Sequence, residues 1–194
     1  MSKNTIAKTV RVVTIPPLLV TSLFIVLYFG KPDFFRGVTD LLAGITFLAL
    51  IPTLAYPLQP LIPGFRGKGR KGQRRLAFIT SAIGYIGGIL YAVISGVSHE
   101  LLLIYGSYLV SVIVLTVFNT VLKRKASGHA CGVAGPIAFL VYIYGPIALL
   151  GLPLLALVFW SSLGMGRHKT GELVVGSVIP IAAMLVSILF VSIV

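Results

Sequence analysis

Residues 130–162 read ACGVAGPIAFLVYIYGPIALLGLPLLALVFWSS, without a single charged side chain. A helix of about 20 apolar residues crosses the hydrocarbon core of a bilayer, so this stretch is too long for one crossing. Pro and Gly are the residues most typical of turns, and Gly145-Pro146 interrupts the run near its middle. We therefore expect one span over about residues 130–144 and another over about 146–162.

Five further apolar runs flank this pair, and the whole chain shares their composition. Of its 194 residues, 57% are hydrophobic and 10% are charged, whereas a soluble domain is about 25% charged. We expect an all-α, polytopic transmembrane bundle with short loops, built as a single integral membrane domain over residues 1–194. It would have about seven spans, or six if residues 130–162 cross once. The other five predicted spans cover about residues 12–30, 38–57, 76–97, 101–122 and 172–194.

The charges are strongly unequal, with 16 Lys and Arg, four Asp and Glu, and a net charge of +12. Basic residues lie between the apolar runs, as they do in loops that stay on the cytoplasmic side. With a cytoplasmic N-terminus, only Lys31 and Arg36 fall outside. We therefore expect the plasma membrane of a prokaryote and a lipid bilayer as partner, not nucleic acid. The single cysteine, Cys131, excludes an internal disulfide and a cysteine-only metal site.

The first polar island is the Ser127-Gly128-His129 sequence, at the predicted start of the fifth span. The first amides of a helix have no intrahelical acceptor, and with the helix dipole they form an anion site. Ser127 suits an N-cap, Gly128 lets the backbone approach a ligand, and His129 can exchange a proton near neutral pH. Positive charge precedes them at Lys123, Arg124 and Lys125.

The second island, residues 167–172, reads RHKTGE and opens the seventh span. His168 and Glu172 are four residues apart and would share a helix face. A carboxylate that accepts the Nδ1 hydrogen leaves Nε2 free as a nucleophile. Arg167 adds a cation.

A helical hairpin separates the two histidines and returns the chain to the side that it left. Both imidazoles can then flank one phosphate, one attacking phosphorus and the other protonating the leaving oxygen. Lys and Arg would neutralise the remaining oxygens. Arg74 and Arg75, at the start of the third span, would reach the same site from the Gly-rich basic loop.

Ser127-Gly128-His129, followed after the hairpin by Gly166-x-His168-x-x-x-Glu172-x-x-x-Gly176, resembles the type 2 phosphatidic acid phosphatase superfamily. The similar region, residues 100–185, would form the phosphatase-like core. The resemblance implies hydrolysis of a lipid phosphate without metal or cofactor. His168 would be the nucleophile, Glu172 its orienting acid and His129 the general acid. Ser127 and the Gly128 amide would hold phosphate oxygens.

The chain departs from the family pattern at four points. Ala126 replaces the usual Pro, no Arg-Pro signature occurs upstream, and Glu172 replaces Asp. Ser161-Ser162 stands where the family has Ser-Arg, so a phosphate-binding arginine is missing and Arg167 would take its place. Lys123, Arg124 and Lys125, or Arg74 and Arg75, would substitute for the missing Arg-Pro.

Three functions remain open at this level. The first is a lipid phosphatase or diphosphatase with a cytoplasmic-face site, acting on a polyprenyl diphosphate or a phosphatidate-type lipid. The second is a protein that binds phosphorylated lipid without turnover. The third is a small transporter, although transporter sites tend to lie near the midplane of the bilayer rather than at one interface.

Overall fold

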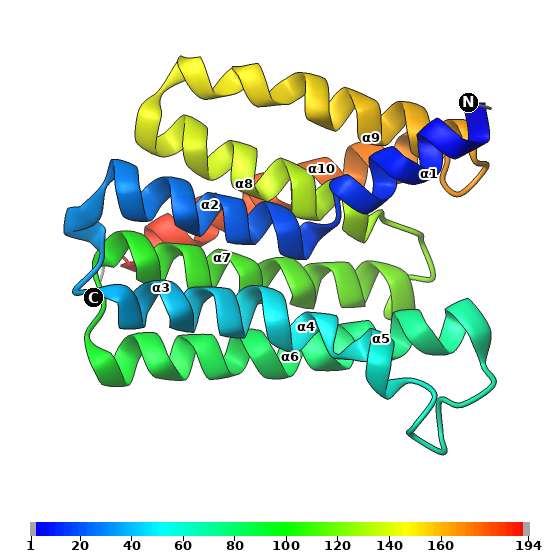
Figure 1. Cartoon of the computed structure of the whole chain (residues 1–194), viewed down its shortest axis with the longest axis horizontal. Helices are drawn as coiled ribbons and strands as arrows, with labels where there is room; N and C mark the ends of the chain where they lie inside the picture. The colour runs from blue at the N-terminus through cyan, green and yellow to red at the C-terminus, as the bar shows by residue number, and fades with distance from the viewer. Residues whose placement is uncertain (1–2, 192–194) are drawn as a thin grey trace.

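The computed structural model describes residues 3–191, and the side chains of residues 5–191, as an all-helical bundle in which none of these residues forms a strand. The long helices run along one axis and are joined at its two ends (Figure 1). The elements are α1 (Lys3–Val13), α2 (Pro16–Gly30), η1 (Pro32–Phe34), α3 (Val38–Ile45), η2 (Thr46–Leu50), α4 (Ile51–Thr53), α5 (Ala55–Leu58), α6 (Gly69–Ser95), α7 (His99–Thr116), η3 (Val117–Val121), α8 (Gly128–Tyr144), η4 (Pro146–Gly151), α9 (Leu152–Gly164) and α10 (Thr170–Val191).

The first predicted span is bent. Most of it is α2, and the axis of α1, which ends at Val13 just before α2 begins, differs from that of α2 by 44° at the break. Pro16 and Pro17 open α2, and proline ends a preceding helix because it lacks an amide hydrogen and restricts the residue before it. The bend carries α1 away from α2 and against α9. It thereby brings the N-terminal helix over the end of the bundle where both polar islands lie (Figure 1).

The hairpin at residues 130–162 turns at the predicted point. Helix α8 ends at Tyr144, and Gly145 follows with φ of 78°, a value that glycine adopts without the cost of a Cβ clash. The 3-10 turn η4 then leads into α9. Since α8 packs against both η4 and α9, the chain returns along the helix that it has just left.

Two other predicted spans differ from the helices in the structure. Helix α6 begins at Gly69, not Leu76, so Arg74 and Arg75 lie on the helix rather than in a loop. The second span is one apolar stretch over Val38–Leu58 whose regular turns are interrupted by the π-helical turn η2. The seventh predicted span ends at residue 194, so its last three residues lie outside the described part.

Five helical stretches of the described chain are long and apolar enough to cross a membrane, and α1 with α2 makes a sixth if the bent pair is one span. Helix α8 is apolar but has only 17 residues. The protein therefore has five or six such stretches, and the predicted count of about seven is not confirmed. Large apolar side chains cover the outside, with Ile94 83% and Phe190 67% exposed, which suits contact with lipid.

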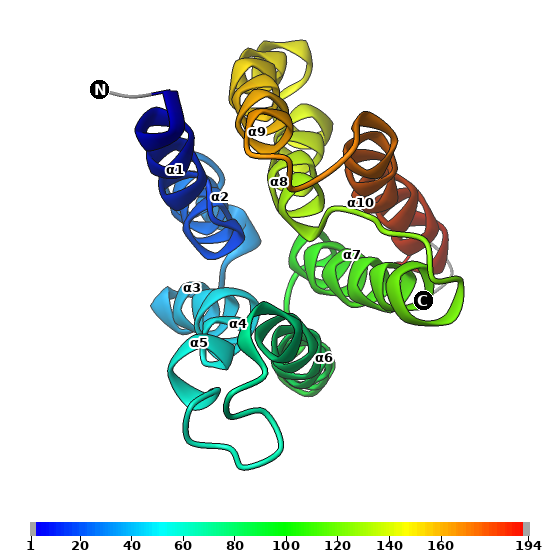
Figure 2. The same ribbon diagram turned by 90° about the vertical axis from the view of Figure 1, so that its right-hand side faces the viewer.

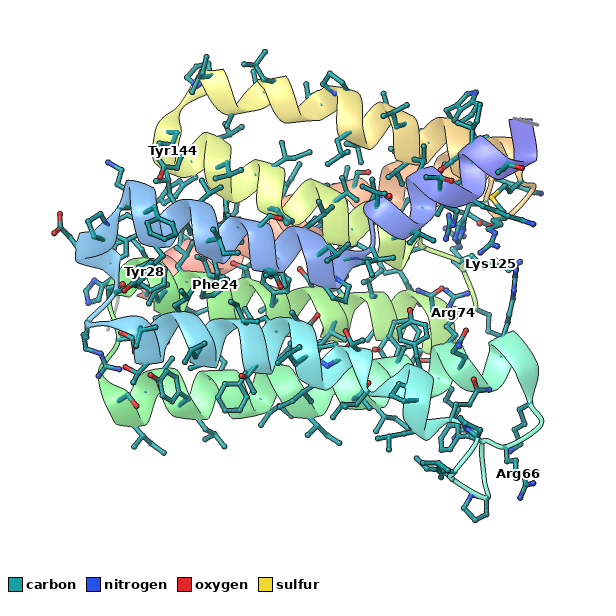
Figure 3. The ribbon with its side chains drawn as sticks, in the orientation of Figure 1. Phe24, Tyr28, Arg66, Arg74, Lys125 and Tyr144 are labelled. Carbon is teal, nitrogen blue, oxygen red and sulfur yellow. The ribbon has the colours of Figure 1, made fainter. Side chains whose placement is uncertain are left out.

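The two ends of the bundle differ in packing. Phe24, Leu27, Phe35 and Tyr105 belong to a dense cluster toward one end, where edge-to-face ring contacts join Phe24, Tyr28 and Phe35. The basic residues that join α5 to α6, η3 to α8 and α9 to α10 lie at the other end. Figure 3 shows the contrast, with Phe24, Tyr28 and Tyr144 far from Arg66, Arg74 and Lys125. The candidate site lies at this basic end.

Candidate functional site at the basic end of the bundle

Ser127 caps α8, as predicted. Its backbone is extended and its Oγ accepts a hydrogen bond from the amide of Ala130 at 3.2 Å. The side chain is fully buried, so its hydroxyl holds the helix start in place. The cap sets Gly128 and His129 in the first turn of α8, just before the apolar residues of that helix.

His168 and Glu172 form the predicted pair at the start of α10. The Nδ1 atom of His168 lies 2.7 Å from Oε2 of Glu172, and the two side chains are only 15% and 18% exposed. The backbone amide of Lys169 also donates to Oε2, at 3.4 Å. Because the carboxylate accepts the Nδ1 hydrogen, the free lone pair of a neutral ring would lie on Nε2.

The two islands are joined by backbone contacts. The amide of Ser127 donates to the carbonyl oxygen of Glu172 at 2.9 Å. One turn later on α10, Gly176 lies directly against the Ser127 backbone, and a Cβ at position 176 would collide with the Ser127 carbonyl oxygen. The start of α8 is therefore placed by the start of α10, with glycine as the residue that permits the contact.

A cavity of about 910 Å³ lies inside the bundle and opens among the basic residues. Residues of α2, α4, α6, α7 and α8 line it, and Figure 2, which looks at the molecule from the basic end, shows these helices arranged around a common centre. Six of the predicted site residues line the cavity: Arg74, Lys125, Gly128, His129, Arg167 and His168. Helices distant in sequence thus bring both histidines and three guanidinium or ammonium groups to one space.

The other predicted phosphate ligands are not brought to the cavity. Arg75, Lys123 and Arg124 are exposed and do not line it, and Ser127 lies behind it as a helix cap. Lys123 adopts a φ of 53°, and the amide of Arg124 bonds to the Phe118 carbonyl oxygen. These two residues follow η3, and their side chains are exposed outside the cavity lining.

Arg74 reaches the cavity from α6. Its guanidinium donates to Oδ1 of Asn119 and, at 3.4 Å, to the carbonyl oxygen of Ala126. Asn119 also accepts from the Ala126 amide and donates to the Leu115 carbonyl oxygen. Asn119 thus connects α6, the end of α7 and the segment that precedes Ser127, and it holds Arg74 beside the site.

Helix α1 supplies site residues that the sequence analysis did not select. Arg11 lines the cavity and donates from Nη1 to Oγ of Ser162 at 2.8 Å. Lys8, Arg70 and Lys71 add further positive charge to the lining. Arg11 carried no local signal beyond its charge, because Pro16 and the bend that follow it decide where α1 lies.

Thr14 fixes the orientation of His129. Its hydroxyl donates to the Val10 carbonyl oxygen at 2.7 Å and lies 2.9 Å from Nε2 of His129. A hydroxyl has one hydrogen, and the Val10 carbonyl takes it, so Nε2 of His129 must be the donor to Thr14. The other ring nitrogen, Nδ1, is left to exchange a proton.

The surroundings of His129 disfavour its charged form. Burial first, and then the charges of Arg11, His168 and Arg167, lower its pKa to about 4. An anion among the same cations would act in the opposite sense, because a nearby negative charge favours the protonated imidazole. An anion bound among these cations would therefore raise the pKa of His129.

Among the residues that the structure describes, no group of three or more His, Cys, Asp or Glu side chains could hold a metal ion. The cavity is lined by several cations and by two imidazoles, one of which is paired with a carboxylate. Comparison with protein families, characterised proteins and solved structures finds no match to the chain.

Proposed function

We propose that this protein is an integral membrane phosphatase that removes phosphate from a lipid phosphate or diphosphate through a phosphohistidine at His168. The observation that carries the proposal is that His168, whose Nδ1 is paired with Glu172, lines the same cation-rich cavity as His129. A base held by a carboxylate and placed among several cations has the parts that phosphoryl transfer needs.

In the first step, Nε2 of His168 attacks phosphorus and a P–N bond forms as the P–O bond to the lipid breaks. The Glu172 carboxylate keeps the hydrogen on Nδ1 and stabilises the positive charge that develops on the ring. Protonated His129 gives its proton to the leaving oxygen. The released lipid alcohol then departs with that proton.

In the second step, water attacks phosphorus and the P–N bond breaks. His129, now neutral, takes the proton from the water. Inorganic phosphate leaves and both imidazoles return to their starting states. The negative charge of the substrate would raise the pKa of His129, because it counteracts the positive charges of Arg11 and Arg167. His129 would then carry the proton that the first step requires.

Arg11 could replace the arginine that the chain lacks relative to the phosphatase pattern. The family has an arginine after the serine of Ser-Arg, whereas this chain has Ser161-Ser162. Ser162 accepts a hydrogen bond from Arg11, so a guanidinium from another helix lies next to that position. A planar guanidinium is well matched to phosphate oxygens, and we assign Arg11 as a phosphate ligand together with Arg74, Lys125 and Arg167.

The position of the site suits a lipid substrate. Both polar islands lie at one end of apolar helices, together with most of the basic residues. By the rule that basic loops stay inside, this end would be cytoplasmic, and the N-terminus with it. An amphiphile could then present its phosphate to the cations while its tail stays in apolar surroundings.

The decisive experiment measures phosphate release from short-chain lipid phosphates by the detergent-purified protein with a chelator present. We expect release that His168→Ala and His129→Ala abolish and that Arg66→Ala, in an exposed loop outside the cavity, leaves unchanged. Binding of lipid phosphate without release would show a binding protein. Release that persists in His168→Ala would remove the phosphohistidine mechanism, and solute flux in liposomes without either would indicate a transporter.

A further inference from the structure

The cavity extends well beyond the groups that phosphate chemistry uses. Past the histidines it continues between α6, α7, α8 and α10, where its walls are mostly apolar. The apolar wall residues include Ala77, Phe78, Val112, Leu115 and Pro180, and Ser81, Ser107, Ser111 and Cys131 lie between them. Neither the attack on phosphorus nor the proton transfers require this inner part.

The inner part ends on a floor of large side chains. Tyr85 and Tyr108 line the cavity there with their rings in edge contact, 5.6 Å apart between centroids. Leu48 and Phe139 line it as well, and both also belong to the dense cluster that contains Phe24 and Tyr105. The hollow half of the bundle therefore stops where the packed half begins.

Two helices give the same depth from the cations to the floor. At about 1.5 Å per residue, the rise from Arg74 to Tyr85 on α6 is about 16 Å. The rise from His129 to Phe139 on α8 is about 15 Å on the same basis. This depth is about half of the ~30 Å hydrocarbon core of a bilayer, so it corresponds to one hydrocarbon chain of moderate length.

The polar groups of the inner part are mostly occupied. Ser107 donates to the Leu103 carbonyl oxygen at 2.8 Å, and Tyr85 is bonded to Ser81. Three buried hydroxyls in the described part of the chain, those of Tyr105, Tyr108 and Ser187, have no partner, and of these only Tyr108 lines the cavity. The walls thus offer a chain mainly apolar surface, with one unpartnered hydroxyl at the end.

We propose that this inner cavity holds the hydrocarbon chain of the substrate and that Tyr108, on the floor, sets its maximum length. The proposal rests on the phosphatase function given above and narrows its substrate class. An extended chain rises about 1.3 Å per bond, from the 3.8 Å that three backbone bonds span, so about a dozen carbons fit between phosphate and floor. The favoured substrate is a lipid phosphate with a chain of that length, not a long polyprenyl diphosphate.

The test compares octyl, dodecyl, hexadecyl and eicosyl monophosphates at equal mole fraction in mixed micelles. We expect kcat/KM to fall at least about tenfold between the dodecyl and eicosyl compounds, because a chain longer than the distance to the floor must displace the floor residues. Tyr108→Ala, which opens the floor, should reduce that fall. Tyr108→Phe, which keeps the ring and removes only the hydroxyl, should retain it.

A second variant protects the test against misfolding of Tyr108→Ala. Val112 lines the cavity one turn nearer to the cations, so Val112→Phe should move the cut-off toward shorter chains. No dependence on length in the unaltered protein would overturn the proposal. So would equal loss in Tyr108→Ala and Tyr108→Phe at every length, since that pattern would mean that the floor serves water or a polar ligand.

A binding measurement separates this inference from the proposed function. The shift in thermal midpoint caused by each alkyl phosphate is recorded with His168→Ala, which cannot form the phosphohistidine. A length cut-off in binding that moves with Val112→Phe supports the proposed chain-binding role of the inner cavity even if the protein hydrolyses nothing. Hydrolysis without a chain-length cut-off in either assay supports the phosphatase function and rejects the inner cavity as the site of the hydrocarbon chain.

Discussion

Arg11 donates a hydrogen bond to Ser162 across 151 positions of sequence, from Nη1 to Oγ at 2.8 Å. The contact connects α1 to the end of α9, and it holds a guanidinium at the mouth of the cavity that contains both histidines. Helix α1 is therefore part of the site, although nothing near Arg11 in the sequence resembles a phosphate-binding motif.

The first prediction concerns this arginine. Arg11→Ala should lower kcat for a lipid phosphate by about 10²–10³, the effect of removing one fixed donor from a transition state. Arg11→Lys should recover only part of the loss, because an ammonium lacks the planar fork. Steady-state kinetics measure this effect. Arg66→Ala is the control, because it removes the same charge from a residue outside the cavity. Equal activity in Arg11→Ala and Arg66→Ala would leave Arg11 with no role in catalysis.

The second prediction separates the roles of the two histidines. A phenolic phosphate has a good leaving group that needs little protonation, whereas an alkyl phosphate needs a general acid. His129→Ala should therefore lose at least about tenfold more activity on the alkyl than on the phenolic compound. His168→Ala should lose both equally, since both reactions need the nucleophile. If His129→Ala lost the same factor of activity on the alkyl and the phenolic compound, as His168→Ala is expected to, the assignment of His129 as the acid would be contradicted.

The third prediction concerns the contact between the two islands. A methyl group at position 176 would collide with the Ser127 carbonyl oxygen, and overpacking of this kind costs about 1–3 kcal/mol. Gly176→Ala should lower both the thermal midpoint and the activity, since the start of α8 must move. Gly171→Ala is the control, because a Cβ there meets nothing within 4 Å. If Gly176→Ala is as stable and active as Gly171→Ala, then this contact does not position the site.

The fourth prediction follows from the pKa of His129, which burial and then Arg11 lower from 6.5 to about 4. Between these values the unfolded chain binds a proton that the folded protein does not. The stability is thus fully present above about pH 6.5 and falls as the pH drops toward 4, by on the order of 3 kcal/mol at 1.36 kcal/mol per pKa unit. The thermal midpoint in detergent should fall over this range, and less so in His129→Gln. The same fall in both proteins would trace the effect to other groups.

The helices and the chemistry of the two islands could be predicted from the sequence because both depend on neighbours along the chain. The turn at Gly145 follows from a glycine and a proline inside an apolar run, and the cap at Ser127 from a hydroxyl three residues before Ala130. The pairing of His168 with Glu172 follows from their helical spacing. Arg75, Lys123 and Arg124 were placed in the site for their charge alone, and a charge does not show which way its side chain points.

Hydropathy and short-range spacing thus determined that this chain is helical, with apolar stretches long enough to cross a membrane and two polar islands that each contain a histidine, since a bilayer and a helix turn each act on a few consecutive residues. Only the tertiary structure decided that Arg11 and Thr14 join them, and that the bundle stays hollow from His129 down to Tyr108 and Phe139. Those features arise from the bend at Pro16 and from how the helices pack around one another. Packing depends on shapes that are far apart in the sequence.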